Sequence, residues 1–405
     1  MRLLAAMLLC VIGLSASTPQ TRATAETLPH DAYVWQRIWT PQLIAAAHRS
    51  SDIVRAWRVL LAEADRSGRW TTIAIPWNDI LATQRPIIAV VRIDGRLDEA
   101  RMPAMLDQLV SRIEDAVARP AVVLAGVEVD YDCPTSKLPT YARFLAEFRT
   151  RLARPIALSI TALPTWMNSA ELERLAKDVD EVMLQVHAVE EPRRGLFNPA
   201  QAALWVEEFG RRIRRPFRVA LPAYDVRVSW QADGRLASVE GEVPLLSGAR
   251  DSELLGAAPE AVLQFLQSLQ RTAPQGLIGI AWFRLPTDAD ARSWSPQTWR
   301  AVVTGTLPPS RLNAGLVPTE RSDLWTVTLA NDGPVDAALP RQVRLDPACA
   351  MADGANGFRL MAGGTQPDRP LVLEAAMGGR LRAHHQRVIG WARCTEPGRA
   401  LHVAQ

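Results

Sequence analysis

Three carboxylates occupy alternating positions in Leu124–Pro134 (LAGVEVDYDCP), a segment that is otherwise largely apolar. Residues two apart on a β-strand share a face, so Glu128, Asp130 and Asp132 are expected to point into one space at intervals of about 6.6 Å. Carboxylates this close couple their protonation, and one of them can keep a proton at neutral pH and act as an acid. The segment therefore predicts a site for proton transfer.

The elements around this segment predict the fold. Between residues 30 and 305, near-continuous apolar segments alternate with amphipathic ones, which indicates parallel strands covered by helices. Eight such strands make a (β/α)8 TIM-type barrel, and no glycine-rich phosphate-binding fingerprint follows the first strand to favour the alternative, a doubly wound sheet. The predicted strands are Ala32–Trp39, Ile53–Leu61, Pro86–Ile93, Val122–Tyr131, Ile156–Leu163, Glu181–His187, Phe217–Leu221 and Leu277–Leu285; the predicted helices are Pro103–Val117, Lys137–Arg151, Ser169–Val179, Pro199–Arg214 and Pro259–Arg271.

The barrel prediction places the acids at its mouth. In such barrels the carboxyl ends of the strands carry the active site. The acidic segment is the fourth predicted strand, so we expect Asp132 nearest the mouth, Asp130 below it and Glu128 deepest. The structural alternative is that an arginine of another strand, such as Arg92 or Arg284, holds these acids.

Two further units follow from the pattern. Ala232-Asp233-Gly234 is a hairpin signal between strand-like segments, which predicts a β insertion over residues 225–258, after the seventh strand. From residue 307 short strand-like segments are separated by turns, which predicts a C-terminal β-sandwich over residues 307–405 and a barrel domain over residues 26–306. Its predicted strands are Trp325–Ala330, Gln342–Leu345, Gly357–Met361, Pro370–Glu374 and Arg387–Cys394.

Residues 1–25 have the form of a signal peptide. Arg2 precedes the short apolar run Leu3–Leu14, and Ala23-Thr24-Ala25 has the form of a signal peptidase site. We therefore expect an exported protein, periplasmic or secreted, with no integral membrane segment after signal removal. A net charge of +3 among 405 residues gives no reason to expect a nucleic-acid partner.

Export permits a disulfide. Cys349 and Cys394 lie in the same C-terminal region and are the predicted pair. Cys133 is then left over, and no histidine lies near it in the sequence to lower its pKa. We expect Cys133 to be an unreactive thiol at a strand end.

The acidic segment resembles the strand-four signature of glycoside hydrolase family 18, the chitinase-like barrels, which reads D-G-x-D-x-D-x-E. Ala125–Asp132 follows that spacing, with Ala125 and Glu128 in place of the first two Asp residues and Asp132 in place of the Glu. The resemblance implies that Asp132 is the acid–base residue and that Asp130 orients the acetamido group of the substrate, which acts as the nucleophile. Glu128 would then fix the charge and rotamer of Asp130. The segments VEVDYDCPTSKLPTYARFL, LSITALPTW and MLQVHAV also resemble an exported bacterial family described as domain of unknown function 3142.

Further candidate binding residues fall at predicted strand ends. Gly279-Ile280-Ala281-Trp282 resembles the family's strand-eight segment, in which a Trp forms the floor of a sugar subsite, and Gln185 takes the place of its strand-six motif. Each candidate also has a structural interpretation, namely packing at the rim or a satisfied polar side chain. The candidates for substrate binding are Trp39, Gln185, His187, Tyr224, Trp282 and Arg284, of which Arg284 is expected to act as a counter-ion to the acids.

These observations predict a glycoside-hydrolase-like protein that acts on a polysaccharide or N-acetylated glycan. The alternatives are a non-catalytic glycan-binding protein on the same scaffold and a hydrolase that uses the carboxylates to bind Mg²⁺ or Ca²⁺. We expect no cofactor and no metal site, because zinc-ligand spacings and a P-loop are absent from the sequence and His384-His385 would point to opposite faces of a strand.

Overall fold

The computed structural model describes residues 27–188, 195–231, 233, 235–240, 251–361, 370–396, 398 and 400–404. The predicted signal peptide and residues 232 and 234 of the predicted hairpin turn lie outside the described residues.

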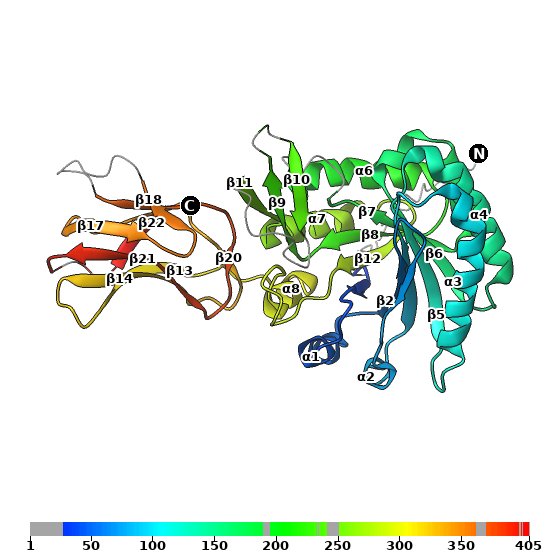
Figure 1. Cartoon of the computed structure of the whole chain (residues 1–405), viewed down its shortest axis with the longest axis horizontal. Coiled ribbons are helices and arrows are strands. Elements are labelled where there is room, and N and C mark those ends of the chain that lie inside the picture. Colours follow the sequence, from blue (N-terminus) through cyan, green and yellow to red (C-terminus); the bar gives the residue numbers. More distant parts are fainter. Residues whose placement is uncertain are drawn as a thin grey trace, which may run out of the picture.

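Eight parallel strands close into a barrel because β1 pairs in parallel with both β12 and β2 (Figure 1). The order around the barrel is β1-β12-β8-β7-β6-β5-β4-β2, and the short β3 (Trp70–Thr72) pairs antiparallel with β2. This confirms the predicted (β/α)8 barrel, with the acidic segment as its fourth strand, β5. The barrel strands are β1 (His30–Val34), β2 (Ala56–Ala64), β4 (Ile87–Ile93), β5 (Leu124–Tyr131), β6 (Ala157–Ala162), β7 (Glu181–Gln185), β8 (Phe217–Pro222) and β12 (Leu277–Phe283).

The helices start where the sequence supplies caps. The side chains of Thr40, Asn198 and Ser295 each accept a hydrogen bond from a backbone N–H of the first turn, and a proline follows each of them at the first helical position. Helices α6 and α7 begin at Pro199 and Pro259, as predicted. The α-helices are α1 (Pro41–Ser50), α2 (Trp77–Leu81), α3 (Met102–Val117), α4 (Leu138–Arg151), α5 (Glu171–Leu175), α6 (Pro199–Arg212), α7 (Pro259–Thr272) and α8 (Pro296–Val303); the 3₁₀ helices are η1 (Glu99–Arg101), η2 (Thr135–Lys137), η3 (Pro164–Asn168) and η4 (Ala176–Asp178).

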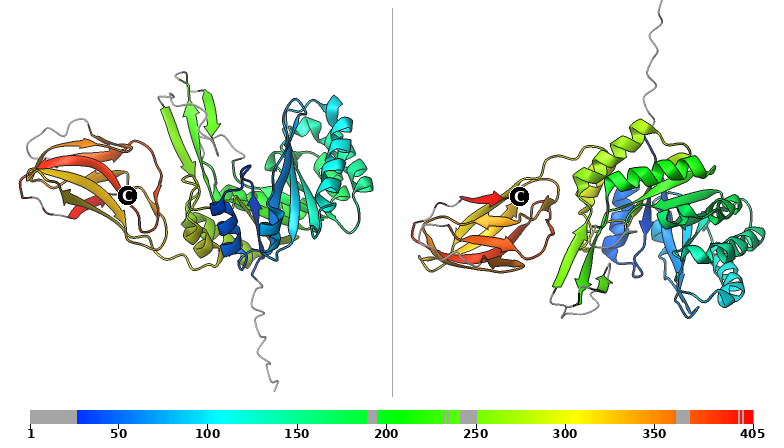
Figure 2. Two further views of the ribbon diagram at one scale, coloured as in Figure 1. Left: turned by 60° about the horizontal axis from the view of Figure 1, so that its bottom comes forward. Right: turned by 90° about the horizontal axis from the view of Figure 1, so that it is seen from above.

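A three-stranded antiparallel sheet follows β8, where the insertion was predicted. Its order is β10 (Leu236–Glu240), β9 (Asp225–Trp230) and β11 (Asp251–Gly256). The sheet stands beside the barrel on the side that faces the C-terminal domain (Figure 2). Because β9 begins three residues after β8 ends, the insertion starts at the carboxyl end of a barrel strand.

The C-terminal domain is an antiparallel β-domain, joined to the barrel after α8. Its eight strands, in the order β17-β21-β14-β13-β22-β16-β19-β18, form one sheet that surrounds an apolar core, since the two edge strands β17 and β18 contact each other. A disulfide joins Cys349 to Cys394 on the adjacent strands β17 and β21. The strands are β13 (Leu312–Pro318), β14 (Leu324–Asn331), β15 (Ala337–Ala338), β16 (Gln342–Arg344), β17 (Cys349–Gly354), β18 (Phe358–Leu360), β19 (Val372–Ala375), β20 (Arg380–Leu381), β21 (Gln386–Cys394) and β22 (Ala400–Ala404).

Polar contacts tie this domain to the barrel. Arg380 makes an ion pair with the buried Asp225, the first residue of β9, and its Nη1 donates to the carbonyl oxygen of Ala257 at 3.1 Å. Asp336 accepts a hydrogen bond at 2.7 Å from the backbone N–H of Ser295, the residue that caps α8. The β-domain therefore contacts segments that follow two barrel strands, β8 and β12.

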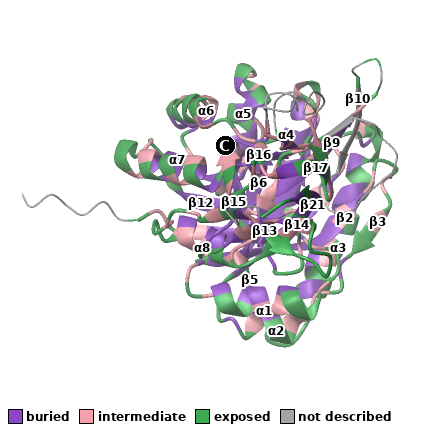
Figure 3. Ribbon diagram, turned by 90° about the vertical axis from the view of Figure 1, so that its left-hand side faces the viewer, coloured by how far each residue is buried: buried purple, intermediate pink, exposed green. Residues whose placement is uncertain are grey.

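Burial separates the barrel into an outer and an inner layer. The outer core lies between strands and helices, which carry both exposed and buried residues (Figure 3). The inner layer, enclosed by the strands, is a smaller apolar cluster that includes Tyr33, Leu60, Val90, Met183 and Ala281.

An ionic cluster occupies the base of the barrel, beneath that apolar layer. The guanidinium of Arg58 is fully buried and makes ion pairs with Asp31 at 3.0 Å, with Glu128 and with Glu181. Arg218 pairs with the same Asp31 and Glu181, at 3.4 and 3.1 Å. Buried charges are tolerated when each has a partner, and loss of one partner leaves the others uncompensated.

Replacement of Arg58 by methionine should therefore destabilise the barrel by about 3–5 kcal/mol, because Glu128 would stay buried without the cation that pairs with it, whereas Asp31 would keep Arg55 and Arg218. Urea unfolding followed by tryptophan fluorescence measures the change. Arg211→Met, on the exposed face of α6, is the matched control and should cost less than about 1 kcal/mol. Equal losses in the two variants would contradict a stabilising role for the cluster.

Candidate active site

The carboxyl end of β5 presents the acids to the barrel mouth. Val127, Val129 and Tyr131 are buried in the outer core, so the alternate residues of this strand face inward. Exposure rises along the inward face: Glu128 is 0% exposed, Asp130 is 7% exposed and Asp132 is exposed. The depth order matches the expectation from the sequence.

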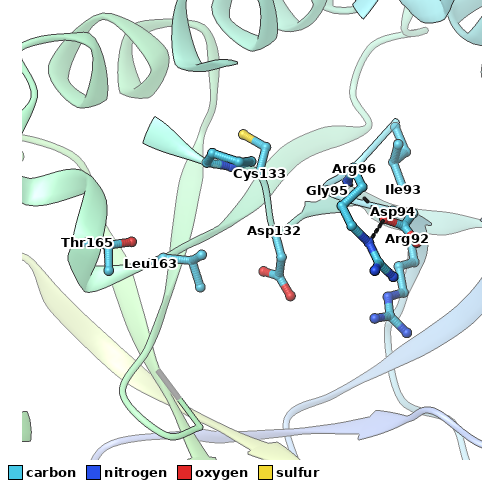
Figure 4. A pocket seen from close by; sticks show the side chains of 10 residues that line it. Arg92, Ile93, Asp94, Gly95, Arg96, Asp132, Cys133, Leu163 and Thr165 are labelled. Carbon is cyan, nitrogen blue, oxygen red and sulfur yellow. Dashed lines mark hydrogen bonds and ion pairs between the residues drawn. The ribbon is translucent and has the colours of Figure 1, made fainter. Parts of the chain in front are cut away.

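A cavity of about 430 Å³ opens beside Asp132 (Figure 4). The carboxylate of Asp132 points into the same space as the guanidinium groups of Arg92 and Arg96. Asp130 does not line this cavity; it lies one inward position deeper on the strand. The lining residues are Arg92, Ile93, Asp94, Gly95, Arg96, Asp132, Cys133, Pro134, Leu163 and Thr165.

The two aspartates form a coupled pair. Burial raises the pKa of Asp130 to about 7, and the neighbouring charge of Asp132 adds to that rise, while Arg92 and the Thr161 hydroxyl oppose it. Desolvation by the surrounding protein also raises the pKa of Asp132, against the influence of Arg92. The pair can therefore hold one proton near neutral pH, which is the condition for general acid catalysis.

Glu128 belongs to the base of the barrel and not to the mouth. Its carboxylate forms an ion pair with Arg58, accepts a hydrogen bond at 2.6 Å from the Tyr33 hydroxyl and is contacted by Thr161 Oγ1 at 3.3 Å. It is fully buried and does not line the cavity beside Asp132, so any part it plays in the site is through Asp130 and not by contact with substrate. Its link to Asp130 is indirect. The charge of Asp130 contributes to raising the pKa of Glu128, and the Thr161 hydroxyl contacts Glu128 and also lowers the pKa of Asp130.

Of the two arginines expected to hold the acids, Arg92 faces them and Arg284 does not. Arg284 pairs with Asp290 in the loop after β12, with Nε at 3.2 Å from Oδ2, so the expected counter-ion role of Arg284 toward the acids is wrong. Arg58 pairs with Glu128, and Arg92 lies opposite Asp130 in the register of β4 and β5.

The aromatic floor of the mouth comes from neighbouring residues. The expectation that Trp282 faces the mouth is wrong: its ring is fully buried in the outer core, where its centroid lies 6.1 Å from that of Trp294 and 6.2 Å from that of Trp299. Phe283, the next residue, faces inward instead and packs against Trp35 with centroids 5.0 Å apart.

Three predicted binding residues gather at the far side of the mouth. Tyr224 and His187 make an edge-to-face contact with centroids 5.8 Å apart, and both pack on Phe283. The Nε2 of Gln185 donates to the carbonyl oxygen of His187 at 3.1 Å. Burial lowers the pKa of His187 to about 4, so this ring is neutral at pH 7 and does not share a proton with the acids.

The hydroxyl of Tyr224 lies within electrostatic reach of the acids, since the charge of Asp132 contributes to raising its pKa, after burial. Trp39 is half-buried just beyond β1 and packs on both the inner and the outer cluster. Cys133 is a buried free thiol whose pKa is raised to about 12 by burial, in keeping with an unreactive cysteine. In the part of the chain that the structure describes, no three His, Cys, Asp or Glu side chains are arranged to hold a metal ion.

Comparison with solved structures agrees with the closed (β/α)8 TIM-type barrel. The Bacillus cereus spore cortex-lytic enzyme SleL aligns with a TM-score of 0.52 at 14% identity, over 69% of this chain and 74% of that one. The SleL of Bacillus megaterium QM B1551 aligns at 0.51 and 12% identity, over 69% and 74%. The C-terminal domain of a putative chitinase from Desulfitobacterium hafniense DCB-2 aligns at 0.50 and 10% identity, over 70% and 100%. At these identities the likeness establishes the fold alone.

The chain belongs to the family described as Domain of unknown function (DUF3142), whose model matches residues 83–288, just over half of the sequence. A second family model, Domain of unknown function (DUF8456), matches residues 314–395 within the β-domain. No curated protein shows a significant match to the chain. None of the helices among the described residues is both long and apolar enough to cross a bilayer.

Replacement of Asp132 by asparagine removes the neighbouring charge and should lower the pKa of Asp130 from about 7 by roughly one unit. The carboxyl ¹³C shift of Asp130, followed by NMR across a pH titration, measures this change. Asp94→Asn removes a charge that lines the same cavity but is not among the causes of the raised pKa of Asp130, and it serves as the control. An unchanged pKa in the Asp132 variant would show that the two carboxylates are not coupled.

Proposed function

We propose that this protein is a hydrolase that cleaves a glycosidic bond in an N-acetylated glycan. The observation that carries the proposal is the coupled pair on β5, in which an exposed Asp132 borders a cavity above a buried Asp130 whose pKa is raised to about 7. Two carboxyl groups whose environments set different protonation states are the machinery of glycoside hydrolysis.

Asp132 takes the role of general acid and base. It is the member of the pair that a substrate in the cavity can touch, and its raised pKa helps it hold a proton for the leaving oxygen. After the bond breaks, the same carboxylate can accept a proton from the attacking water. Asp130, one inward position deeper, stabilises through its charge the positive charge that develops on the acetamido group as the oxygen of that group attacks the anomeric carbon, by the route that the family 18 resemblance implies.

The remaining mouth residues bind and orient the sugar. Phe283, which is half-buried and packs on Trp35, supplies an apolar ring against which a sugar can lie. Tyr224 and Gln185 supply polar groups on the opposite side from Arg92. The neutral His187 orients Gln185 through its carbonyl oxygen and does not take part in proton transfer.

Asp132→Asn tests the catalytic role. Loss of the general acid should lower the rate of release of reducing ends from N-acetylglucosamine oligomers at least about 100-fold, with the thermal unfolding temperature preserved. Asp107→Asn, an exposed aspartate on α3, is the matched control and should keep full activity. Undiminished hydrolysis by the Asp132 variant would reject the role assigned to this residue.

A second candidate function is glycan binding without cleavage. One feature favours it: Asp132 is one methylene shorter than the Glu of the family 18 pattern, and a displacement of about 1 Å at a reacting group can cost on the order of 100-fold in rate. A binding protein would retain oligomers of N-acetylglucosamine with no release of products over days. Product release that depends on Asp132 excludes this alternative.

We also propose that the protein is exported. Support comes from the apolar run at Leu3–Leu14 followed by Ala23-Thr24-Ala25, and from the disulfide Cys349–Cys394, since disulfides persist in oxidising compartments. Recovery of the mature chain from the periplasm or medium of an expressing bacterium, with its N-terminus near Glu26, would support export. Retention of an uncleaved chain in the cytoplasm would oppose it.

A further inference from the structure

The cavity beside Asp132 carries more positive charge than cleavage of a neutral sugar requires. Arg92 and Arg96 both line it, and their guanidinium groups lie on the same side, across the space from the Asp132 carboxylate (Figure 4). Asp94 also lines it, but its Oδ1 is taken up by the backbone N–H of Arg96 at 2.8 Å and by Arg96 Nε at 3.4 Å. That contact uses Arg96 Nε, so the two Nη groups of Arg96 remain able to donate to a ligand in the cavity.

The guanidinium of Arg92 makes no ion pair and no hydrogen bond within the part of the chain that the structure describes. It lies over the Trp35 ring, 5.9 Å from the centroid, and acts on Asp130 and Asp132 through its charge alone. A guanidinium has five N–H donors in a planar fork that fits a carboxylate with two parallel bonds. A half-buried arginine in this state is arranged to meet an acceptor that arrives from the cavity.

The loop that carries Arg96 is held against the acid strand. A Cβ on Gly95 would lie 1.9 Å from the carbonyl oxygen of Asp132, so only glycine permits this close approach. From the other side, Lys137 Nζ donates to the carbonyl oxygens of Gly95 at 3.2 Å and Leu97 at 2.5 Å. The backbone that carries Arg96 is therefore held at a fixed distance from Asp132, which reduces the loop entropy lost when a ligand binds.

From these contacts we infer that Arg92 and Arg96 form a subsite for a carboxylate-bearing sugar, so that the glycan is acidic. The inference rests on the proposed function and names its substrate class. A carboxylate bound there lies near Asp132 and, as a like charge, favours the protonated form of Asp132 that donates to the leaving oxygen. Substrate binding would then increase the protonated fraction of Asp132, while Arg92 balances the charge of the bound carboxylate.

Isothermal titration of the full chain at low ionic strength tests this subsite. The ligands are hyaluronan oligosaccharides, which alternate N-acetylated and carboxylated sugars, and the same oligosaccharides with their carboxyl groups reduced to alcohols. We expect the carboxylated form to bind at least about tenfold more tightly, as for one charge-assisted pair. Arg92→Gln and Arg96→Gln should each reduce that ratio by about tenfold, while Arg211→Gln, an exposed arginine on α6, should leave it unchanged.

Each outcome decides between the two proposals. Equal binding of the carboxylated and reduced forms overturns the acidic subsite and leaves the proposed hydrolase standing. Tighter binding of the carboxylated form that persists in both arginine variants also overturns the subsite, and a sulfated chitin oligosaccharide that binds as tightly as hyaluronan overturns its selectivity for carboxylate. Binding of none of these glycans overturns both proposals. If Arg92→Gln does not fold, Arg96→Gln carries the test, because Arg96 is 78% exposed and its replacement disturbs no packing.

Discussion

The placement of cations at the same depths as the carboxylates is the constraint on which this barrel depends. Three acids on one face of a strand repel one another, and burial makes their charges costly. Arg58 meets Glu128 at the base, and Arg92 lies opposite Asp130 nearer the mouth. Since the base arginine is fully paired and the mouth arginine is not, the deep acid is structural and the outer acids remain available for chemistry.

Arginines also hold the loops at the rim of the barrel. Arg284 is paired with Asp290 in the loop after β12, and Arg382 of the β-domain donates from Nη1 to the carbonyl oxygen of Asp288 at 2.7 Å in that loop. Arg380, also of the β-domain, forms an ion pair with Asp225, the residue next to Tyr224. The C-terminal domain therefore stabilises two of the segments that shape the mouth, although none of its residues lines the cavity beside Asp132.

The fold was accessible from the sequence because it depends on local periodicity. All eight barrel strands, the insertion and five strands of the β-domain lie where apolar patterning predicted them, and the acidic triplet is conspicuous because it alternates within an apolar run. Helices α1 and α8 were missed although Thr40-Pro41 and Ser295-Pro296 supply their caps.

The wrong predictions concern which side chains of a strand point inward and which residues form ion pairs. Every residue of β12 (LIGIAWF) is apolar or glycine, so no alternation tells which face is inward, and a shift of one residue exchanges Trp282 for Phe283. The ion pair of Glu128 with Arg58 joins residues 70 apart in sequence across the barrel, and no local pattern specifies it. Arg58 inside the otherwise apolar second strand could nevertheless have indicated a buried acidic partner.

The most direct test of the account is the pH dependence of glycan hydrolysis by the unmodified protein. If Asp130 and Asp132 share the catalytic proton, kcat/KM should fall about tenfold per pH unit above the upper pKa of the pair, near 7, because that proton is then lost. A kcat/KM that stays constant from about pH 6 to about pH 9 would show that the pair holds no catalytic proton and would contradict the account.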